Sequence, residues 1–219
     1  MLSLSPTQQR ILGALIEKHM TTPEHYPLTT KALVAACNQI SNRDPVVAYD
    51  EDTVIDAVNE LRGYNAARSI KRSGERAVKH LELADEVFEI NRKQKALLGV
   101  MILRGPQTLM ELRTRTERYI AFDGVGDVEA TLGAMMSADN ATVTRLERQP
   151  GHKERRYQHL VGDSQLSATS EPAEVEAPAS SASGGLSDQV ATLREEVVTL
   201  REEVEELRGL QESEAEFSE

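Results

Sequence analysis

The same motifs occur twice in the sequence in the same order, and this repeat constrains the fold more than any other feature. Residues 11–16, ILGALI, are echoed by residues 97–102, LLGVMI. The Pro-x-Thr of residues 27–29 returns at residues 106–108. Later echoes pair Val54, Val58 and Leu61 with Val128, Leu132 and Met135, Gly74 with Gly151, and His80-Leu81 with His159-Leu160. Because the echoes keep one order, at offsets between 74 and 86 residues, the sequence predicts two copies of one structural unit.

Each copy has the signals of three helices. Ser5 precedes a proline and lies three residues before Gln8, which predicts a capping box at the start of the first helix. Thr29 is the expected cap of the second helix, and Asp50 or Asp52 that of the third. Apolar residues recur at helical spacing after each cap, so one face of each helix is expected in a core.

A β-hairpin is expected after the third helix. Two strand-like runs, residues 67–71 and 77–83, flank a turn at Gly74. Three helices followed by a hairpin is the order of a winged helix, a relative of the helix-turn-helix. The predicted fold is therefore mainly α with small β-hairpins, an α+β class. Two tandem winged-helix domains are expected, at residues 1–88 and 89–162.

The remaining residues form a different kind of sequence. Residues 163–185 are rich in Ser, Ala, Pro and Glu, which predicts a disordered linker. Residues 186–210 have a heptad pattern, and residues 211–219 form an acidic tail. β-branched residues at position a with Leu at d favour a two-stranded parallel coiled coil, and so a homodimer. A solitary solvated helix, or packing on the body, is the alternative. The predicted dimerisation residues are Val190, Leu193, Val197, Leu200, Val204 and Leu207.

Charge is divided unevenly along the chain. The net charge of −11 belongs to the tail, because residues 163–219 hold 3 Arg against 15 acidic residues. Residues 1–162 hold 22 basic and 21 acidic residues, so the predicted folded body is close to neutral. The pattern of charge, and not its total, must therefore identify partners.

Three long stretches resemble one bacterial family. They are residues 17–46, EKHMTTPEHYPLTTKALVAACNQISNRDPV, residues 103–115, LRGPQTLMELRTR, and residues 150–160, PGHKERRYQHL. These stretches resemble the YceH-like family, and the similarity spans residues 5–162. The resemblance implies a tandem winged-helix protein of unestablished biochemical role, and it supplies no catalytic residues to transfer.

The residues themselves offer little catalytic chemistry. Cys37 is the only cysteine, so it is expected to be a small buried residue in a reducing compartment. The glycine-rich residues 123–127 lack the Lys and Ser/Thr of a phosphate loop and are expected to form a turn before a helix. His152 and His159 are expected to join a charged surface. We predict a protein that is not an enzyme, has no cofactor and binds no metal.

Targeting signals are also missing from the sequence. The N-terminus has no basic region followed by an apolar run, which argues against a signal peptide. No stretch approaches the roughly 18 consecutive apolar residues that a membrane span needs. A cytoplasmic location and no contact with membranes are the expectations.

Nucleic acid is one possible partner, through the two hairpins. The third helix carries Glu51, Asp52, Asp56 and Glu60, and these carboxylates would repel phosphates in a major groove. The hairpins and the fifth predicted helix are basic, and could contact the backbone of duplex DNA without reading its sequence. The predicted nucleic-acid-binding residues are Arg68, Lys71, Arg72, Arg76, Lys79, Arg113, Arg115, Arg148, Lys153, Arg155 and Arg156, with Arg118 and Arg145 beside them. Solvated hairpin tips are an equally good interpretation of these charges.

A protein-docking scaffold that binds no DNA is the competing hypothesis. The acidic third helices and the loop at residues 38–50 would then contact a protein partner. In this loop Asn38, Asn42 and Arg43 are the predicted contact residues, and Arg43 would donate paired hydrogen bonds to a phosphate or carboxylate. In the alternative, structural interpretation, Asn38 ends the second helix in left-handed geometry and the loop is pinned to the core.

Overall fold

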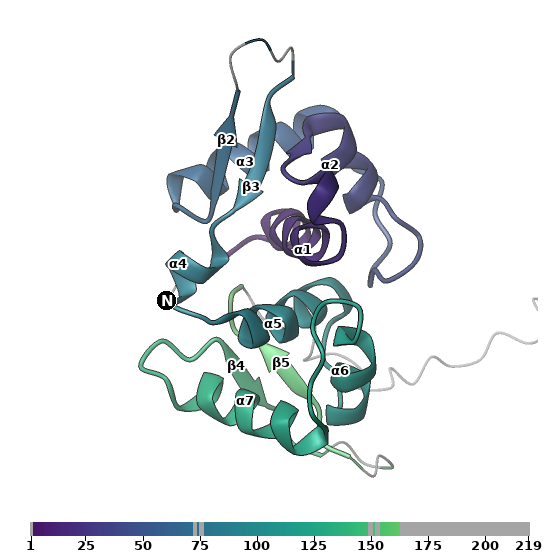
Figure 1. Cartoon of the computed structure of the whole chain (residues 1–219), viewed down its shortest axis with the longest axis vertical. Helices are drawn as coiled ribbons and strands as arrows, with labels where there is room; N and C mark the ends of the chain where they lie inside the picture. Colours follow the sequence, from purple (N-terminus) through teal and green to yellow (C-terminus); the bar gives the residue numbers. More distant parts are fainter. Residues whose placement is uncertain (1, 72–73, 75–76, 149–150, 152–153, 163–219) are drawn as a thin grey trace, which may run out of the picture. The chain divides into compact units, whose positions relative to one another are not determined.

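The computed structural model describes residues 2–71, 74, 77–148, 151 and 154–162 (Figure 1). In this part of the chain the fold is mixed α/β, with seven α-helices and two small antiparallel sheets. The prediction of a mainly helical α+β chain with small hairpins is confirmed at this level. The linker, coiled coil and acidic tail predicted for residues 163–219 lie outside the described residues.

The first half contains the predicted helices and hairpin. Its main elements are α1 (Pro6–Thr21), α2 (Thr30–Cys37), α3 (Glu51–Gly63), β2 (Ala67–Ile70) and β3 (Lys79–Glu82). The predicted caps are confirmed. Ser5 and Gln8 form a capping box on α1, and the side chains of Thr29 and Asp50 accept backbone hydrogen bonds at the starts of α2 and α3.

Three short elements of this half were not predicted. They are the 3₁₀-helix η1 (Pro23–His25), β1 (Leu28–Thr29) and α4 (Ala84–Phe88). Strand β1 pairs with β3, so the sheet order is β1-β3-β2. Elements of two to five residues are too short for a hydrophobic period to show in the sequence.

The second half repeats the order with shorter strands. It contains α5 (Arg92–Arg104), α6 (Leu109–Thr116), α7 (Val125–Ser137), β4 (Val143–Arg145) and β5 (Tyr157–His159). β4 and β5 pair antiparallel. Gly124 is the N-cap of α7, so Asp123 and Gly124 form a bend before this helix, as predicted, whereas residues 125–127 of the glycine-rich segment lie in its first turn.

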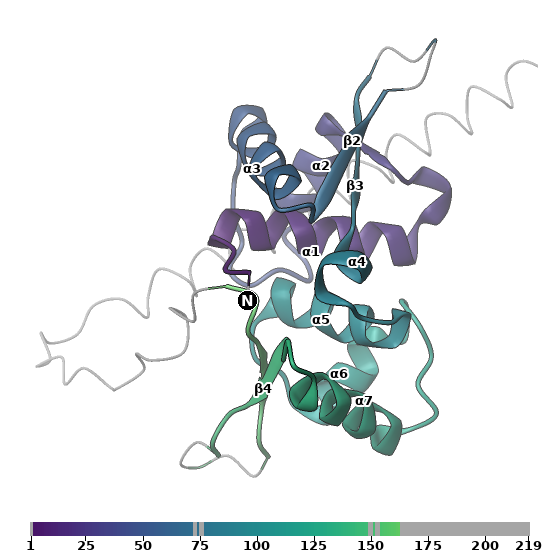
Figure 2. The same ribbon diagram turned by 90° about the vertical axis from the view of Figure 1, so that its left-hand side faces the viewer.

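The two halves share one hydrophobic core. α1 packs on α5, and one cluster of buried residues extends through both halves (Figure 2). The N-terminal segment also joins the second half, because the Leu4 amide donates to the Val161 carbonyl at 3.0 Å. The boundary predicted after residue 88 falls at the end of α4, and the residues on its two sides are packed against one another.

Two glycines at equivalent positions of the repeat allow α1 and α5 to come close. A Cβ atom on Gly13 would lie 2.8 Å from Cγ2 of Ile102, and one on Gly99 would lie 2.7 Å from Cγ2 of Ile16. Both distances are far below van der Waals contact. The glycine echo in the sequence therefore marks the place where the two copies pack together.

Candidate nucleic-acid interface and the 38–50 loop

The first hairpin presents basic side chains to solvent. Arg68 on β2 and Lys71 just after it are exposed, and Lys79 on β3 is half-buried. Among the described residues, no hydrogen-bond or ion-pair partner is present for the side chains of Arg68 and Lys71. Arg72 and Arg76 lie outside the described residues. The first hairpin therefore keeps two cations available for an anionic partner.

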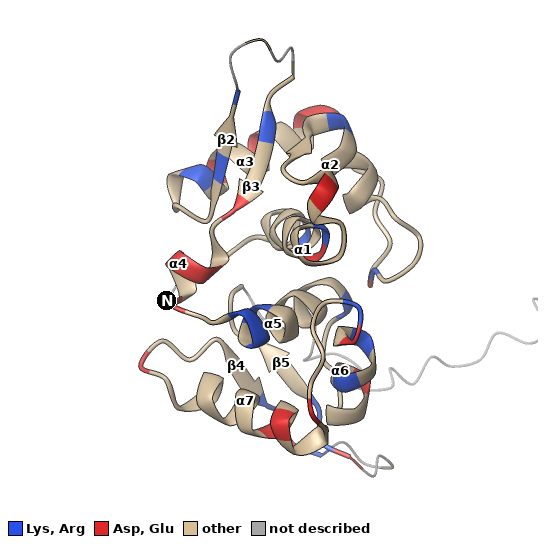
Figure 3. Ribbon diagram, viewed as in Figure 1, with Lys and Arg blue, Asp and Glu red and all other residues tan. Residues whose placement is uncertain are grey.

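The third helix beside this hairpin is acidic, as predicted. Its exposed residues on the polar side are Glu51, Asp52, Asp56, Asn59 and Glu60. Figure 3 shows red segments on this helix, which also contains Arg62, and blue segments on β2 and β3, the last residue of which is Glu82. The two kinds of charge therefore lie on neighbouring elements.

The second hairpin divides its arginines between solvent and the body. Arg145, Arg148 and Arg155 are exposed, and no partner for their side chains is present in the described part of the chain. Arg156 instead donates from Nη1 to Oε2 of Glu111 at 2.9 Å and to the carbonyl of Pro106 at 2.8 Å. Arg156 thus anchors the hairpin to α6. Lys153 lies outside the described residues.

The arginines of α6 and the turn after it are partly committed to carboxylates. Arg115 lies 3.8 Å from Oε1 of Glu111, and Arg118 lies 3.4 Å from Oε1 of Glu17. Arg113 is half-buried on α6. Two of these three arginines are therefore paired with acids of the body and are less available to an anionic partner.

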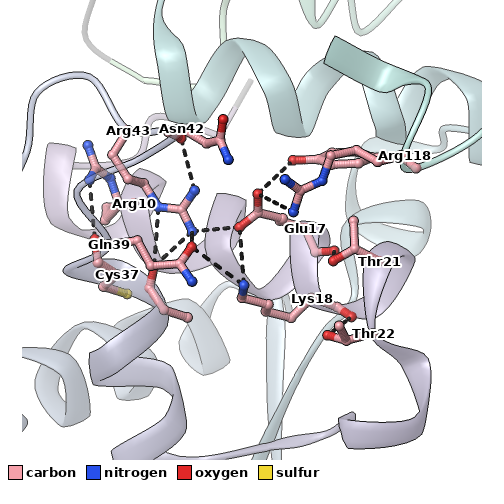
Figure 4. A network of polar contacts seen from close by, with 12 residues as sticks. Arg10, Glu17, Lys18, Thr21, Thr22, Cys37, Gln39, Asn42, Arg43 and Arg118 are labelled. Atoms are coloured by element: carbon pink, nitrogen blue, oxygen red, sulfur yellow. Dashed lines mark hydrogen bonds and ion pairs between the residues drawn. The ribbon is translucent and has the colours of Figure 1, made fainter. Parts of the chain in front are cut away.

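The 38–50 loop is fastened from within by Arg43 (Figure 4). The Arg43 side chain is fully buried and lies 2.6 Å from Oε2 of Glu17 on α1. The same guanidinium donates to the carbonyls of Ala36 and Asn42 and to Oε1 of Gln39. With these donors occupied, Arg43 has the geometry of an internal clamp, and the structure supports the structural interpretation of this residue.

The two asparagines of the loop also help to fix its conformation. Nδ2 of Asn38 donates to the Tyr49 carbonyl at 2.7 Å, and the Tyr49 amide donates to Oδ1 of Asn38 at 2.8 Å. The prediction that Asn38 adopts left-handed geometry is wrong, because its φ is −89°. Asn42 has φ 62° instead, a conformation that asparagine tolerates better than most residues.

The loop is tied to both halves of the body. Arg10 of α1 is buried and donates to the carbonyls of Cys37 and Pro45. The Asp44 amide donates to the carbonyl of Leu103 on α5 at 2.8 Å. The loop thus forms part of the contact between the two copies of the repeat.

Glu17 is the central residue of this contact, a role that was not predicted. Its carboxylate is 1% exposed and accepts from Arg43 of the loop, Arg118 after α6 and the Tyr119 hydroxyl (Figure 4). Burial by itself raises the pKa of Glu17, but the hydrogen bond and charge of Arg43, together with the charges of Lys18 and Arg118, hold the pKa below its ordinary value. Glu17 is therefore ionised and joins the two halves.

A second buried carboxylate joins the halves on another side of α1. Glu82 of β3 lies 2.6 Å from Nδ1 of His19 and 2.9 Å from Nζ of Lys95 on α5. Burial opposes ionisation of Glu82, but these two partners keep its pKa below the ordinary value. A pocket of 260 Å³ beside them is lined by His19, Met20, Pro23, Asp85, Arg92 and Lys95. Lys95 also lies 2.5 Å from Asp85, so the buried charges next to the pocket are engaged with one another.

Cys37 and His159 are both buried. Cys37 is a small core residue, as predicted, and burial raises the pKa of its thiol to about 12. The prediction that His159 joins a charged surface is wrong, because this residue of β5 is buried and only 9% exposed. No partner for its Nδ1 is present among the described residues. His152 lies outside them.

Burial of His159 predicts a loss of stability in mild acid. Desolvation lowers the pKa of His159 from 6.5 to about 4, so between these values the unfolded chain binds a proton that the folded chain does not. Above pH 6.5 His159 therefore does not reduce the free energy of unfolding, and below this value the free energy of unfolding decreases as the pH falls toward 4. We expect His159→Gln to reduce the stability difference between pH 7 and pH 5 by about 2 kcal/mol in urea titrations. His25→Gln, at an exposed histidine, is the control, and an unchanged pH dependence in His159→Gln would contradict this account.

The six predicted dimerisation residues, Val190 to Leu207, lie outside the described part of the chain. Within the described residues, no helix is long and apolar enough to cross a membrane. The same residues contain no group of three or more His, Cys, Asp or Glu side chains placed to hold a metal ion.

Known bacterial proteins resemble this chain over most of its length. A UPF0502 protein of Opitutus terrae is 46% identical over 192 residues, which cover 87% of this chain and 83% of that protein. A UPF0502 protein of Solibacter usitatus is 45% identical over 195 residues, or 87% of this chain and 93% of that protein. A third, from Aliivibrio salmonicida, is 44% identical over 159 residues, or 70% and 72% of the two chains.

The family model described as "Protein of unknown function, DUF480" matches residues 4–152. This range contains most of the repeat, both buried carboxylates and the 38–50 loop. The resemblance to a bacterial family of unestablished function, noted from the sequence, is thereby confirmed. The chain belongs to the DUF480 family.

Proposed function

We propose that each half of the described body is a winged helix. The element order supports this proposal, since three helices precede a two-stranded hairpin in both halves. In the first half, β1 adds the third strand that lies beside the hairpin. The domains would be residues 1–88 and 89–162, followed by the linker, a parallel dimeric coiled coil at residues 186–210 and the acidic tail.

We further propose that the protein is a non-enzymatic DNA-associated or regulatory protein, whose hairpins contact the phosphate backbone. One observation carries this proposal. The exposed side chains of Arg68, Lys71, Arg145, Arg148 and Arg155 have no carboxylate partner within the described residues, whereas the buried cations Arg43 and Lys95 are paired. Unpaired exposed cations on projecting hairpins can neutralise phosphates and release their counterions.

Backbone contact, and not base recognition, is the mode that fits these charges. An ordinary recognition helix would enter the major groove with its N-terminal residues at the base edges. The first turn of α3 carries Glu51 and Asp52, both exposed. Their charges oppose such an approach, so the proposed binding would be weak in sequence preference and strongly dependent on salt.

The proposed interface is smaller than the set of basic residues in the sequence. Arg115, Arg118 and Arg156 have carboxylate partners that fix elements of the body. Moving these side chains to phosphates would break those contacts. We therefore assign the proposed phosphate contacts to the five exposed hairpin residues named above.

Substitution of the first hairpin tests the proposal. We expect Arg68→Ala/Lys71→Ala to weaken binding to a mixed-sequence duplex about tenfold at low salt, since each lost phosphate contact removes counterion release. Fluorescence anisotropy of a labelled duplex measures this change. Lys31→Ala/Arg92→Ala is the matched control, because it removes two exposed cations outside both hairpins.

Two results would contradict the proposal. The first is an equal loss of affinity in the control, which would show that total charge and not the hairpin binds DNA. The second is no duplex binding by the unsubstituted chain at low salt while its circular dichroism remains helical.

Protein docking is the second candidate, and a specific surface favours it. Ile40 is 85% exposed and Val46 is 54% exposed on the loop that Arg43 and Arg10 hold in place. Two apolar side chains displayed on a fixed loop suit a protein contact. A helical chain that fails to bind duplex at low salt would favour this candidate over the first.

A further inference from the structure

The two hairpins lie at opposite ends of the described body. In both views of the ribbon, β2 and β3 extend from one end of the long axis and β4 and β5 extend toward the other (Figures 1 and 2). α1 and α5, which pack on each other, lie between them. The basic residues of the two hairpins are therefore separated by the packed helices.

The contacts between the halves hold this arrangement. Arg118 of the second half reaches Glu17 of the first, and Lys95 reaches Glu82. Both carboxylates are 1% exposed, and Gly13 and Gly99 seat the two helices against each other. Because a shared core and buried ion pairs connect the halves, rotation of one hairpin toward the other would expose apolar surface and unpaired charges.

Duplex DNA cannot easily reach both hairpins at once. Its persistence length is about 150 base pairs, so a segment as short as this body behaves as a stiff rod. A rod seated on one hairpin would have to bend around the packed helices to reach the other. The two sets of cations are therefore better matched to two separate duplex segments.

We propose that one chain binds two duplex segments, one at each hairpin, and so bridges DNA. This inference rests on the proposed function, since it requires that the hairpins bind phosphate backbones. Arg68 and Lys71 would contact one duplex, and Arg145, Arg148 and Arg155 the other. Glu147 and Glu154 are also exposed near the second set, so the second hairpin is expected to be the weaker site.

A bridging assay tests the inference with the full chain. One duplex is fixed to beads and a second, fluorescent duplex is free in solution. Recovery of the fluorescent duplex on the beads measures bridging, and recovery of the protein measures binding. The substitutions Leu193→Glu/Leu200→Glu are included in every sample, and sedimentation confirms a monomer, so that two linked chains cannot form the bridge.

The expected result is that this chain recovers the second duplex. Adding Arg68→Ala/Lys71→Ala, or Arg145→Ala/Arg148→Ala/Arg155→Ala, should lower recovery of the second duplex roughly tenfold. In both cases some protein should remain on the beads through the intact hairpin. Lys31→Ala/Arg92→Ala should leave bridging unchanged.

Different failures separate the two proposals. If the chain does not bind the beads at all, the proposed DNA function is overturned, and the bridging inference with it. If the chain binds the beads and recovers no second duplex, DNA binding stands and bridging is overturned. Bridging that survives loss of either hairpin also overturns the inference.

Discussion

Replacement of Glu17 by Leu should destabilise the protein by about 3–5 kcal/mol, because it leaves the guanidinium of Arg43 buried without a counter-charge. Arg43 is fully buried and lies 2.6 Å from the carboxylate. Arg118 and Tyr119 would lose the same partner. The free energy of unfolding in urea measures the effect, with Glu24→Leu, at an exposed acid, as the control.

A double substitution separates the charge from the packing. Glu17→Leu/Arg43→Leu removes both charges and fills their space with apolar side chains, so it should recover part of the stability lost in Glu17→Leu. A Glu17→Leu variant that loses less than about 1 kcal/mol would contradict a buried ion pair here, since exposed pairs contribute that little.

Replacement of Gly99 by Leu is expected to cost at least about 2 kcal/mol, since overpacking displaces a well-packed helix pair. Even the first added carbon would lie 2.7 Å from Cγ2 of Ile16, a methyl group fixed on the branched Cβ of a buried side chain. Gly133 provides the control, because nothing lies within 4 Å of a Cβ atom placed there. Gly133→Ala should instead stabilise α7 by roughly 0.5–1 kcal/mol.

Thermal and urea unfolding of these two variants form the test. A Gly99→Leu protein as stable as the unsubstituted chain would mean that α1 and α5 do not pack at this distance. The same result would remove the argument that the two halves form one body.

The sequence predicted the features that depend on neighbours along the chain. Capping residues such as Ser5 and Thr29 act within three positions, and both caps are present. The repeat predicted two sets of three helices and a hairpin for the same reason, since each element has its own period and its own turn residues. β1 and α4 escaped prediction because neither is long enough to show a period.

The clamp of the 38–50 loop could not be predicted from local pattern. Arg43 has the composition of an exposed loop residue, and its partner Glu17 lies 26 residues away. One signal was present. The apolar residues of α1 continue from Ile11 to Ile16 without a polar face, and a helix that is apolar all round is a buried helix. Polar residues on such a helix, Glu17 and Arg10, must then find buried partners.

The candidate interface was predicted in part. Exposure of the hairpin cations followed from their positions near a turn. The pairs Arg156–Glu111 and Arg118–Glu17 depend on tertiary contacts, so the sequence could not show that these two arginines are engaged. The Arg115–Glu111 pair is local, at i,i+4 spacing on α6, and could have been read from the sequence. The proposed interface is smaller and divided between two ends of the body.

The salt dependence of duplex binding tests the central claim most directly. The logarithm of the binding constant of the full chain for a mixed-sequence duplex would be measured against the logarithm of salt concentration, from about 50 to about 200 mM. If the exposed hairpin cations contact phosphates, two at one hairpin and three at the other, the slope for a duplex bound at one hairpin should lie between about −2 and −3, and it should approach zero in a variant with Ala at Arg68, Lys71, Arg145, Arg148 and Arg155. A slope near zero, or one that this variant leaves unchanged, would contradict binding of the phosphate backbone by the hairpins.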